Sequence, residues 1–218
     1  IILLGDNFYE EGVENINDKL WMNYIDAFKN IPSKNIHSIL GNHDYIKNPN
    51  CQINNNYWNT PNFNYKMSFS NHTDLFFIDT IPLHVKHCGI SKDKIEEVHN
   101  DNLKNIIKNQ LNWLKTELNE SKDKKKIIFG HYPIITNGYY HKNMKPIYKK
   151  LYNIFEKYNV TAYISGHEHN IQYLKRSKNN YKFRQFICGS SAENRLIEYK
   201  NNNEIDMYDN TDNYIMTI

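Results

Sequence analysis

Four short apolar segments of this chain each end in a glycine that is followed at once by side chains able to bind a metal ion. The four sequences are Gly5-Asp6, Gly41-Asn42-His43, Gly130-His131 and Gly166-His167-Glu168-His169. Short apolar runs are typical of buried strands, and glycine lets the backbone turn sharply where a strand ends. Because parallel strands bring their carboxyl ends to one edge of a sheet, we expect the four turns to converge there.

The apolar segments alternate with segments of helical periodicity. Strands are predicted at residues 1–4, 36–40, 75–79, 127–129 and 162–165, and helices at residues 18–29, 103–118 and 147–158. Residues 49–70 are predicted to be a long loop or an irregular hairpin, and the chain after residue 181 alternates like antiparallel strands. Strands that alternate with helices predict an α/β layered sheet.

The first strand and the first helix carry local signals. Four consecutive apolar residues, from Ile1 to Leu4, predict a strand that is buried on both faces. Asp18 is a candidate N-cap for the helix that follows it. The chain opens inside an expected core strand, so we expect it to be a segment of a longer protein.

The composition excludes several classes of protein. No apolar run approaches the roughly 20 residues of a membrane-spanning helix, so no span is expected. The formal net charge of +3 is too small to indicate a nucleic-acid-binding protein. Three cysteines are too few for a disulfide scaffold. A length of 218 residues allows one large domain or two small ones.

The polar residues at the strand ends form a set of oxygen and nitrogen donors. Besides the carboxylate of Asp6 and the imidazoles, the set contains the amide of Asn42 and the phenol of Tyr9. One metal ion seldom takes so many protein ligands, whereas two ions bridged by a carboxylate do, and these donors suit Fe, Zn and Mn. Two ions about 3.5–4 Å apart are the arrangement for in-line phosphoryl displacement. We expect Glu168 to face solvent or to support the ligands beside it.

Longer stretches around the four turns carry a resemblance to a known family. They are Gly5-Asp6-Asn7-Phe8-Tyr9, Gly41-Asn42-His43-Asp44, Gly130-His131-Tyr132-Pro133 and Gly166-His167-Glu168-His169-Asn170. The chain resembles the calcineurin-like metallophosphoesterases, and more narrowly the purple acid phosphatases of the tartrate-resistant type. The resemblance implies a single domain over residues 1–218, an α/β sandwich of two mixed β-sheets flanked by α-helices, truncated at both ends. It also implies that the family's first strand, with its metal-binding Asp, falls before Ile1.

The resemblance assigns a role to each candidate metal ligand. Asp6 would bridge two metal ions, and Tyr9 and His169 would bind the first ion, expected to be Fe(III). The second ion, expected to be Fe(II), Zn or Mn, would be bound by Asn42, His131 and His167.

Two further histidines are the catalytic candidates that the resemblance implies. His43 would bind the substrate phosphate and protonate the leaving alkoxide. His141 lies near the place of another histidine of the family, although the loop spacing differs here. The implied reaction is hydrolysis of phosphate monoesters at acidic pH, with a metal-bound hydroxide attacking phosphorus in line.

Two alternative functions stay open at this stage. One is a phosphodiesterase of the same superfamily, and the other is a non-catalytic scaffold with an incomplete metal site. For the acid phosphatase, the expected partner is a phosphorylated small-molecule or protein substrate, with no nucleic acid and no membrane span, and the expected state is a monomer. The resemblance alone suggests a secreted or lysosome-like compartment.

Other polar residues are expected to be structural. The lysine-rich segment 122–126 is interpreted as a solvated turn, and Asp44 as a support for His43 or a cap. Five histidines outside the strand ends are expected on the surface or in loops: His37, His72, His84, His87 and His99.

Overall fold

The strands form two sheets of different size, within the described residues 1–178, 181–190, 195, 197 and 206–209 of the computed structural model. The smaller sheet pairs β1 (Ile2–Leu4) with β2 (His37–Ile39) in parallel. The larger sheet has the strand order β3-β4-β5-β6-β8-β7-β9. Its strands are β3 (Tyr65–Ser70), β4 (Thr73–Ile78), β5 (Lys125–Gly130), β6 (Ala162–Ser165), β7 (Ile171–Lys178), β8 (Tyr181–Cys188) and β9 (Asp206–Asp209). The helices are α1 (Leu20–Phe28), α2 (Lys92–His99), α3 (Leu103–Glu120) and α4 (Lys145–Lys157).

The register of the strands decides where the polar turns lie. Strands β4, β5, β6 and β8 are parallel neighbours, whereas β3 and β7 run antiparallel to theirs, so the large sheet is mixed. Gly130 at the end of β5 lies opposite Ser165 at the end of β6. In the small sheet, Leu4 lies opposite Ile39. The turns that follow these residues therefore leave each sheet at the same level, as the sequence predicts.

The two sheets stack as a sandwich between helices. Alternate residues of β4 divide between two apolar clusters, because successive side chains of a strand point to opposite faces. Leu75 and Phe77 pack towards the small sheet with Ile39 of β2. Phe76 and Ile78 pack in the cluster that contains the apolar faces of α2, α3 and α4. Each fully buried side chain of this kind contributes roughly 1.5–3 kcal/mol.

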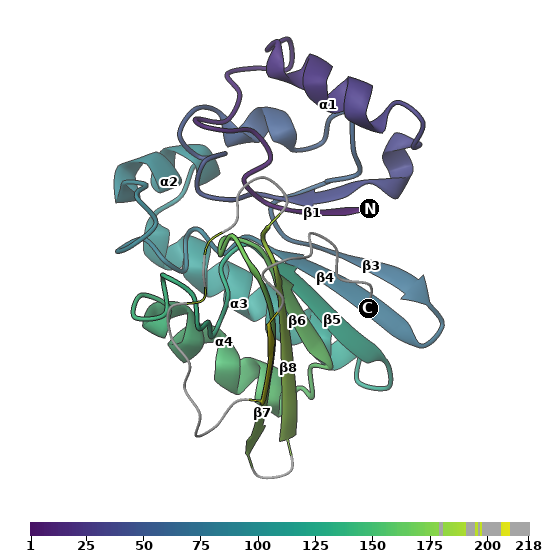
Figure 1. The fold of residues 1–218 in the computed structure, drawn as a ribbon, viewed down its shortest axis with the longest axis vertical. Helices are drawn as coiled ribbons and strands as arrows, with labels where there is room; N and C mark the ends of the chain where they lie inside the picture. Colours follow the sequence, from purple (N-terminus) through teal and green to yellow (C-terminus); the bar gives the residue numbers. More distant parts are fainter. Residues whose placement is uncertain (179–180, 191–194, 196, 198–205, 210–218) are drawn as a thin grey trace.

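Helix α1 lies on the outer side of the small sheet, away from α3 and α4 (Figure 1). Its buried Trp21 packs in an aromatic cluster with Phe8 and Trp58. The observed layers confirm the predicted α/β sandwich of two sheets flanked by helices. Among the described residues, no helix is long and apolar enough to cross a membrane.

Several local expectations are corrected. Strand β1 is half-buried and not buried on both faces, because it is the edge of a two-stranded sheet. Asp18 precedes the cap position, although its Oδ1 atom accepts a hydrogen bond from Leu20 N at 3.1 Å. The end of the predicted 49–70 loop is β3. Helix α2 had no prediction, because only Ile95 and Val98 of it are buried.

Some residues that were expected at the surface or in loops are buried. His37 lies inside β2, and His84 is 1% exposed in the turn after β4. Lys126 is also buried, and its Nζ atom donates to the carbonyl oxygens of Ser121 and Lys124. The lysine-rich segment is therefore only partly solvated, because the ammonium group of Lys126 forms hydrogen bonds with carbonyl oxygens of the turn before it. The three cysteines are free thiols.

Candidate metal centre

Asp6 lies in a turn with an uncommon backbone conformation directly after β1. Gly5 has a φ of +86° and Asp6 has a φ of +54°, a region that residues other than glycine adopt at a cost. Gly41, just beyond β2, packs against this turn, and a Cβ atom at Gly41 would overlap the Asp6 carboxylate. The close approach of the two strand ends therefore holds the carboxylate at the shared edge of the sheets.

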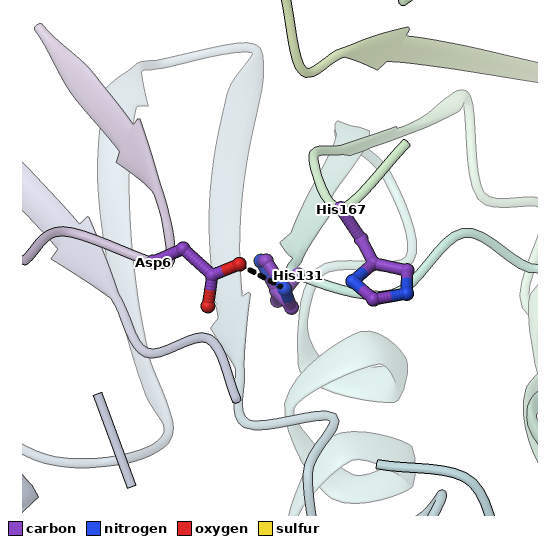
Figure 2. Close-up of side chains that lie close together, drawn as sticks. All are labelled: Asp6, His131 and His167. Atoms are coloured by element: carbon purple, nitrogen blue, oxygen red, sulfur yellow. Dashed lines mark ion pairs between the residues drawn. The ribbon is translucent and has the colours of Figure 1, made fainter. Parts of the chain in front are cut away.

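The Asp6 carboxylate is contacted by three neighbours. Its Oδ2 atom lies 3.3 Å from His131 Nε2, and the Tyr9 hydroxyl donates to the same oxygen at 3.2 Å. The backbone N–H of His43 donates to Oδ1 at 2.9 Å. Burial acts to raise the pKa of Asp6, but His131 and His43 together outweigh it, so the pKa lies well below its usual range. Asp6 is therefore an ionised carboxylate that lies beside other side chains able to bind a metal ion (Figure 2).

His131 joins the two sheets at this edge. Its Nδ1 atom lies 2.8 Å from the carbonyl oxygen of Leu4 in β1, so Nδ1–H donates to that oxygen. Its Nε2 atom faces Asp6 and lies 3.2 Å from Oδ1 of Asn42. Burial disfavours the charged imidazole, but Asp6 raises the pKa of His131 above its usual value. An imidazole that donates one N–H to a carbonyl and presents its other nitrogen is typical of metal ligands.

His167 follows β6 and is held between aromatic rings. It has a φ of +63°, and its ring lies 4.4 Å from Tyr132 and 4.3 Å from Tyr140. Its ring centroid is 5.1 Å from that of His131. Burial, followed by the nearby His131, lowers the pKa of His167 well below its usual value. The ring is therefore a neutral imidazole, which is the form that binds a metal ion.

Tyr9 and His169 meet beside Asp6. The Tyr9 hydroxyl lies 3.2 Å from Nε2 of His169, in addition to its hydrogen bond with Asp6. Burial and the Asp6 carboxylate raise the pKa of Tyr9 well above its usual value. An ionised Tyr9 would therefore require a strong cation beside it.

These side chains line a cavity of about 360 Å³. One ligand atom each from Asp6, His131 and His167 lies within 4.8 Å of the others, and Figure 2 shows the three side chains gathered at this point. An ionised carboxylate beside imidazole nitrogens and a phenol fits Fe, Zn or Mn. The residues present therefore fit a metal centre of the expected kind.

The sequence comparisons identify the family. The family model described as calcineurin-like phosphoesterase matches residues 1–170. This chain belongs to the calcineurin-like phosphoesterase family. The family and its purple acid phosphatase members imply a dimetal centre.

Curated relatives of this chain are named as acid phosphatases. Tartrate-resistant acid phosphatase type 5 of Rattus norvegicus is 36% identical over 190 residues, which cover 80% of this chain and 56% of the relative. Purple acid phosphatase 3 of Arabidopsis thaliana is 32% identical over 208 residues, which cover 88% of this chain and 54% of the relative. The chain spans about half the length of the curated relatives it matches.

A solved structure with a similar fold is that of GAP50, described as the anchor in the inner membrane complex of Plasmodium. It superposes with a TM-score of 0.70 at 24% identity and covers 97% of this chain and 67% of its own. At this identity the likeness shows the fold alone.

The two catalytic candidates lie in different surroundings. The His43 ring lies 4.6 Å from the Tyr9 ring, and its Nδ1 atom is held by the carbonyl oxygen of Glu10. His141 lies in the loop after Tyr140, with its Nδ1 atom 3.1 Å from Gly138 O, and its charge acts on Glu168. His43 is thus beside Asp6, whereas His141 is near Glu168, the carboxylate between His167 and His169.

Glu168 does not face solvent, contrary to one of the two expectations. It is fully buried, and Oε1 accepts hydrogen bonds from Thr136 Oγ1 and Tyr140 N, both at 3.0 Å. Burial raises its pKa. Glu168 therefore positions the loop that carries Tyr140 against His167.

Asp44 holds the backbone of the site and not the imidazole of His43. Its fully buried carboxylate accepts hydrogen bonds from the N–H groups of Asn7 and Gly41, and from Gln52 Nε2 at 3.0 Å. Burial and the nearby Asp6 raise the pKa of Asp44 to about 6. Asp44 thus joins the turns after β1 and β2.

Arg195 is a residue of the site that the sequence pattern did not indicate. Its backbone N–H donates to His169 O at 2.6 Å, and its guanidinium donates to the Tyr140 hydroxyl at 3.3 Å. Its charge also lowers the pKa of Tyr9, against the larger effects of burial and Asp6. The residue lies outside every strand-end motif, so spacing could not have found it.

Proposed function

We propose that this chain hydrolyses phosphate monoesters at acidic pH with a pair of metal ions held at the edge of the sandwich. The observation that carries the proposal is the position of Asp6. Its ionised carboxylate is contacted at Oδ2 by Tyr9, which also contacts His169, and by His131. A carboxylate in contact with two groups of donors is what a bridging ligand requires.

The ligand roles proposed for the other residues follow this division. Tyr9 and His169 would hold the first ion, proposed to be Fe(III), because a trivalent cation can keep a phenol ionised against burial and a neighbouring carboxylate. Three residues would hold the second ion, proposed to be Fe(II), Zn or Mn: Asn42, His131 and His167. When bound, the two ions would supply an activated water molecule and share the negative charge that develops on phosphorus.

His43 is proposed as the general acid. Its Nδ1 atom is engaged by Glu10 O, which leaves Nε2 as the atom that exchanges a proton with the leaving alkoxide. Its ring lies beside Tyr9, so a phosphate near Asp6 is within its reach. An imidazolium can also bind the phosphate before it donates its proton, and acidic pH favours that form.

The test uses the full-length natural protein, purified with its metals. Metal analysis and a visible spectrum are recorded first, and hydrolysis is then measured with p-nitrophenyl phosphate and bis(p-nitrophenyl) phosphate between pH 4 and 8, a range that spans roughly the usual pKa of histidine. We expect iron, a visible absorption band and preference for the monoester. Asp6→Asn should lose both the metals and the activity, whereas the exposed Asp26→Asn should lose neither.

The same measurements distinguish the alternatives. Preference for the diester would assign the chain to the phosphodiesterases of its superfamily. A folded protein with neither metals nor hydrolysis would support a non-catalytic scaffold. A colourless, iron-free protein with full activity would contradict the assignment of Tyr9 to Fe(III).

A further inference from the structure

A second and larger cavity lies outside the metal centre. Its volume is about 530 Å³, and its wall is formed by residues 82–87 after β4 and by the first turns of α3 and α4. Figure 1 shows α3 and α4 beside the large sheet, at a distance in the fold from α1. The lining shares no residue with that of the metal cavity and contains none of the candidate ligands.

The floor of this cavity is apolar. It is formed by Leu83 and Val85 from the turn after β4, by Leu103 and Ile107 from α3, and by Pro146 of α4. Cavities of about 300–1,000 Å³ with mostly apolar walls are typical of sites for small molecules. The volume and the floor therefore suit an organic molecule with an apolar body.

The rim of the cavity carries an excess of positive charge. Five lysines line it, namely Lys86, Lys142, Lys145, Lys149 and Lys150. No aspartate or glutamate is part of the lining, and none of the five forms an ion pair within the described part of the chain. Burial and the nearby charge of Lys86 lower the pKa of Lys150, whose Nζ atom donates to Leu83 O at 2.9 Å. A cluster of like charges without counter-ions favours an anionic ligand.

The start of α4 adds to the positive electrostatic potential of the lysines. Met144 caps the 13-residue helix without a side-chain hydrogen bond, and the first turn contains no acidic residue. Free N–H groups and the helix dipole at an amino terminus favour an anion. Lys145 and Lys149 belong to the same first turns. The helix end and the lysines therefore both create a positive electrostatic potential in the cavity.

A buried polar atom in the wall has no partner. His84 is 1% exposed, it lines the cavity, and its Nδ1 atom forms no hydrogen bond among the described residues. An orphaned buried nitrogen costs free energy unless a ligand or water satisfies it. His84 thus provides a hydrogen-bonding atom in a cavity that otherwise has an apolar floor and a rim of lysines.

We propose that this cavity binds a small organic anion in which a phosphate, phosphonate or carboxylate group is attached to an apolar body. The anionic group is bound by the lysines and the start of α4, and the apolar body lies on the floor formed by Leu83, Val85 and Ile107. The concave shape favours a small molecule over a flat lipid surface. The His84 ring lies 4.6 Å from Tyr132, which in turn packs on His167, so one aromatic side chain separates this anion site from the candidate metal centre.

The test is calorimetric titration with octylphosphonate, an anion with an apolar tail and no ester bond to hydrolyse. We expect wild-type protein to bind it and the Lys86→Glu/Lys149→Glu double variant to bind about tenfold more weakly or not at all. The matched control is Lys108→Glu/Lys115→Glu, which reverses the same number of charges on exposed positions of α3 outside the lining. Since all four lysines are exposed, thermal melting should show that both double variants stay folded.

Three further titrations decide what is bound. Asp6→Asn should keep the octylphosphonate affinity, since this residue belongs to the metal centre. If Asp6→Asn instead lost octylphosphonate binding while the Lys86→Glu/Lys149→Glu variant bound normally, the ligand would lie at the metals and the proposal would be overturned. Methylphosphonate should bind more weakly than octylphosphonate, and equal affinity would contradict a role for the apolar floor. Binding to phosphatidic acid vesicles without binding of soluble octylphosphonate would replace the small molecule by a membrane surface.

Discussion

The hydroxyl of Tyr9 lies 3.2 Å from Nε2 of His169, although the two residues are 160 positions apart in the chain. Tyr9 follows the end of β1 and His169 follows the end of β6, so the contact joins turns from the two different sheets. The same hydroxyl also donates a hydrogen bond to Asp6. The candidate centre is therefore assembled only when the two sheets are stacked.

Tyr9→Phe should abolish the visible absorption of the metal-loaded protein. Phenylalanine keeps the ring but removes the oxygen that would bind Fe(III), so charge transfer from a phenolate is no longer possible. The measurement is the visible spectrum together with the iron content per chain. Tyr139→Phe is the matched control, because Tyr139 is 58% exposed and lies outside the lining of the metal cavity. An unchanged band in Tyr9→Phe would exclude Tyr9 as the chromophoric ligand.

Asp44→Asn should destabilise the fold and weaken metal binding together. The amide has one acceptor oxygen where the carboxylate accepts from Asn7, Gly41 and Gln52, so at least one buried donor loses its partner. A buried donor left without its partner costs about 1–3 kcal/mol. Urea unfolding and metal titration check both effects. The exposed Asp93→Asn on α2 should change neither quantity.

The sequence predicted the parts of the site that depend on local pattern. The end of β5 at Gly130 and the position of His131 after it follow from an apolar run and a glycine. The hydrogen bond from His131 to Leu4 O depends on how the two sheets stack, and no local pattern records it. The packing of Tyr140 on His167 likewise depends on the buried carboxylate of Glu168, which was predicted to face solvent or to support its neighbours.

Charged residues were the least predictable part of the fold. Lys126 is buried because the carbonyl oxygens of its own turn satisfy its ammonium group, which a count of lysines cannot show. Asp44 is buried because two turns converge on it, and Arg195 reaches the site from outside all four motifs. Charge patterns predict average exposure, whereas the few buried charges are decided by long-range hydrogen bonds.

His84 should make stability depend on pH. Burial, followed by the nearby His87 and Lys150, lowers its pKa from 6.5 to about 4 in the folded chain. The unfolded chain therefore takes up the proton first as the pH falls, so stability is full above 6.5 and is lost as the pH falls towards 4. Between pH 7 and 5 the loss due to this one group is about 2 kcal/mol.

The measurement is urea unfolding at both pH values for wild type and His84→Gln. We expect the difference between pH 7 and pH 5 to shrink by the stated amount in the variant, because glutamine does not titrate. His72→Gln, at an exposed position, should leave the difference unchanged. An equal difference in wild type and His84→Gln would show that protonation of His84 is not linked to unfolding.

Gly5→Ala should be far more damaging than the same change at Gly89, although both glycines have positive φ values, +86° and +74°. The backbone cost of alanine in this region is about 1–2 kcal/mol and applies to both. At Gly5 the new Cβ atom would also lie 2.6 Å from His131 Nδ1 and 2.7 Å from Gly41 N, whereas nothing lies within 4 Å of it at Gly89. Because the first contact displaces the hydrogen bond of His131 with Leu4, Gly5→Ala should also weaken metal binding. Urea unfolding and metal titration of both variants isolate the effect of the short contacts at Gly5. Equal losses of stability at the two positions would show that only the backbone conformation matters.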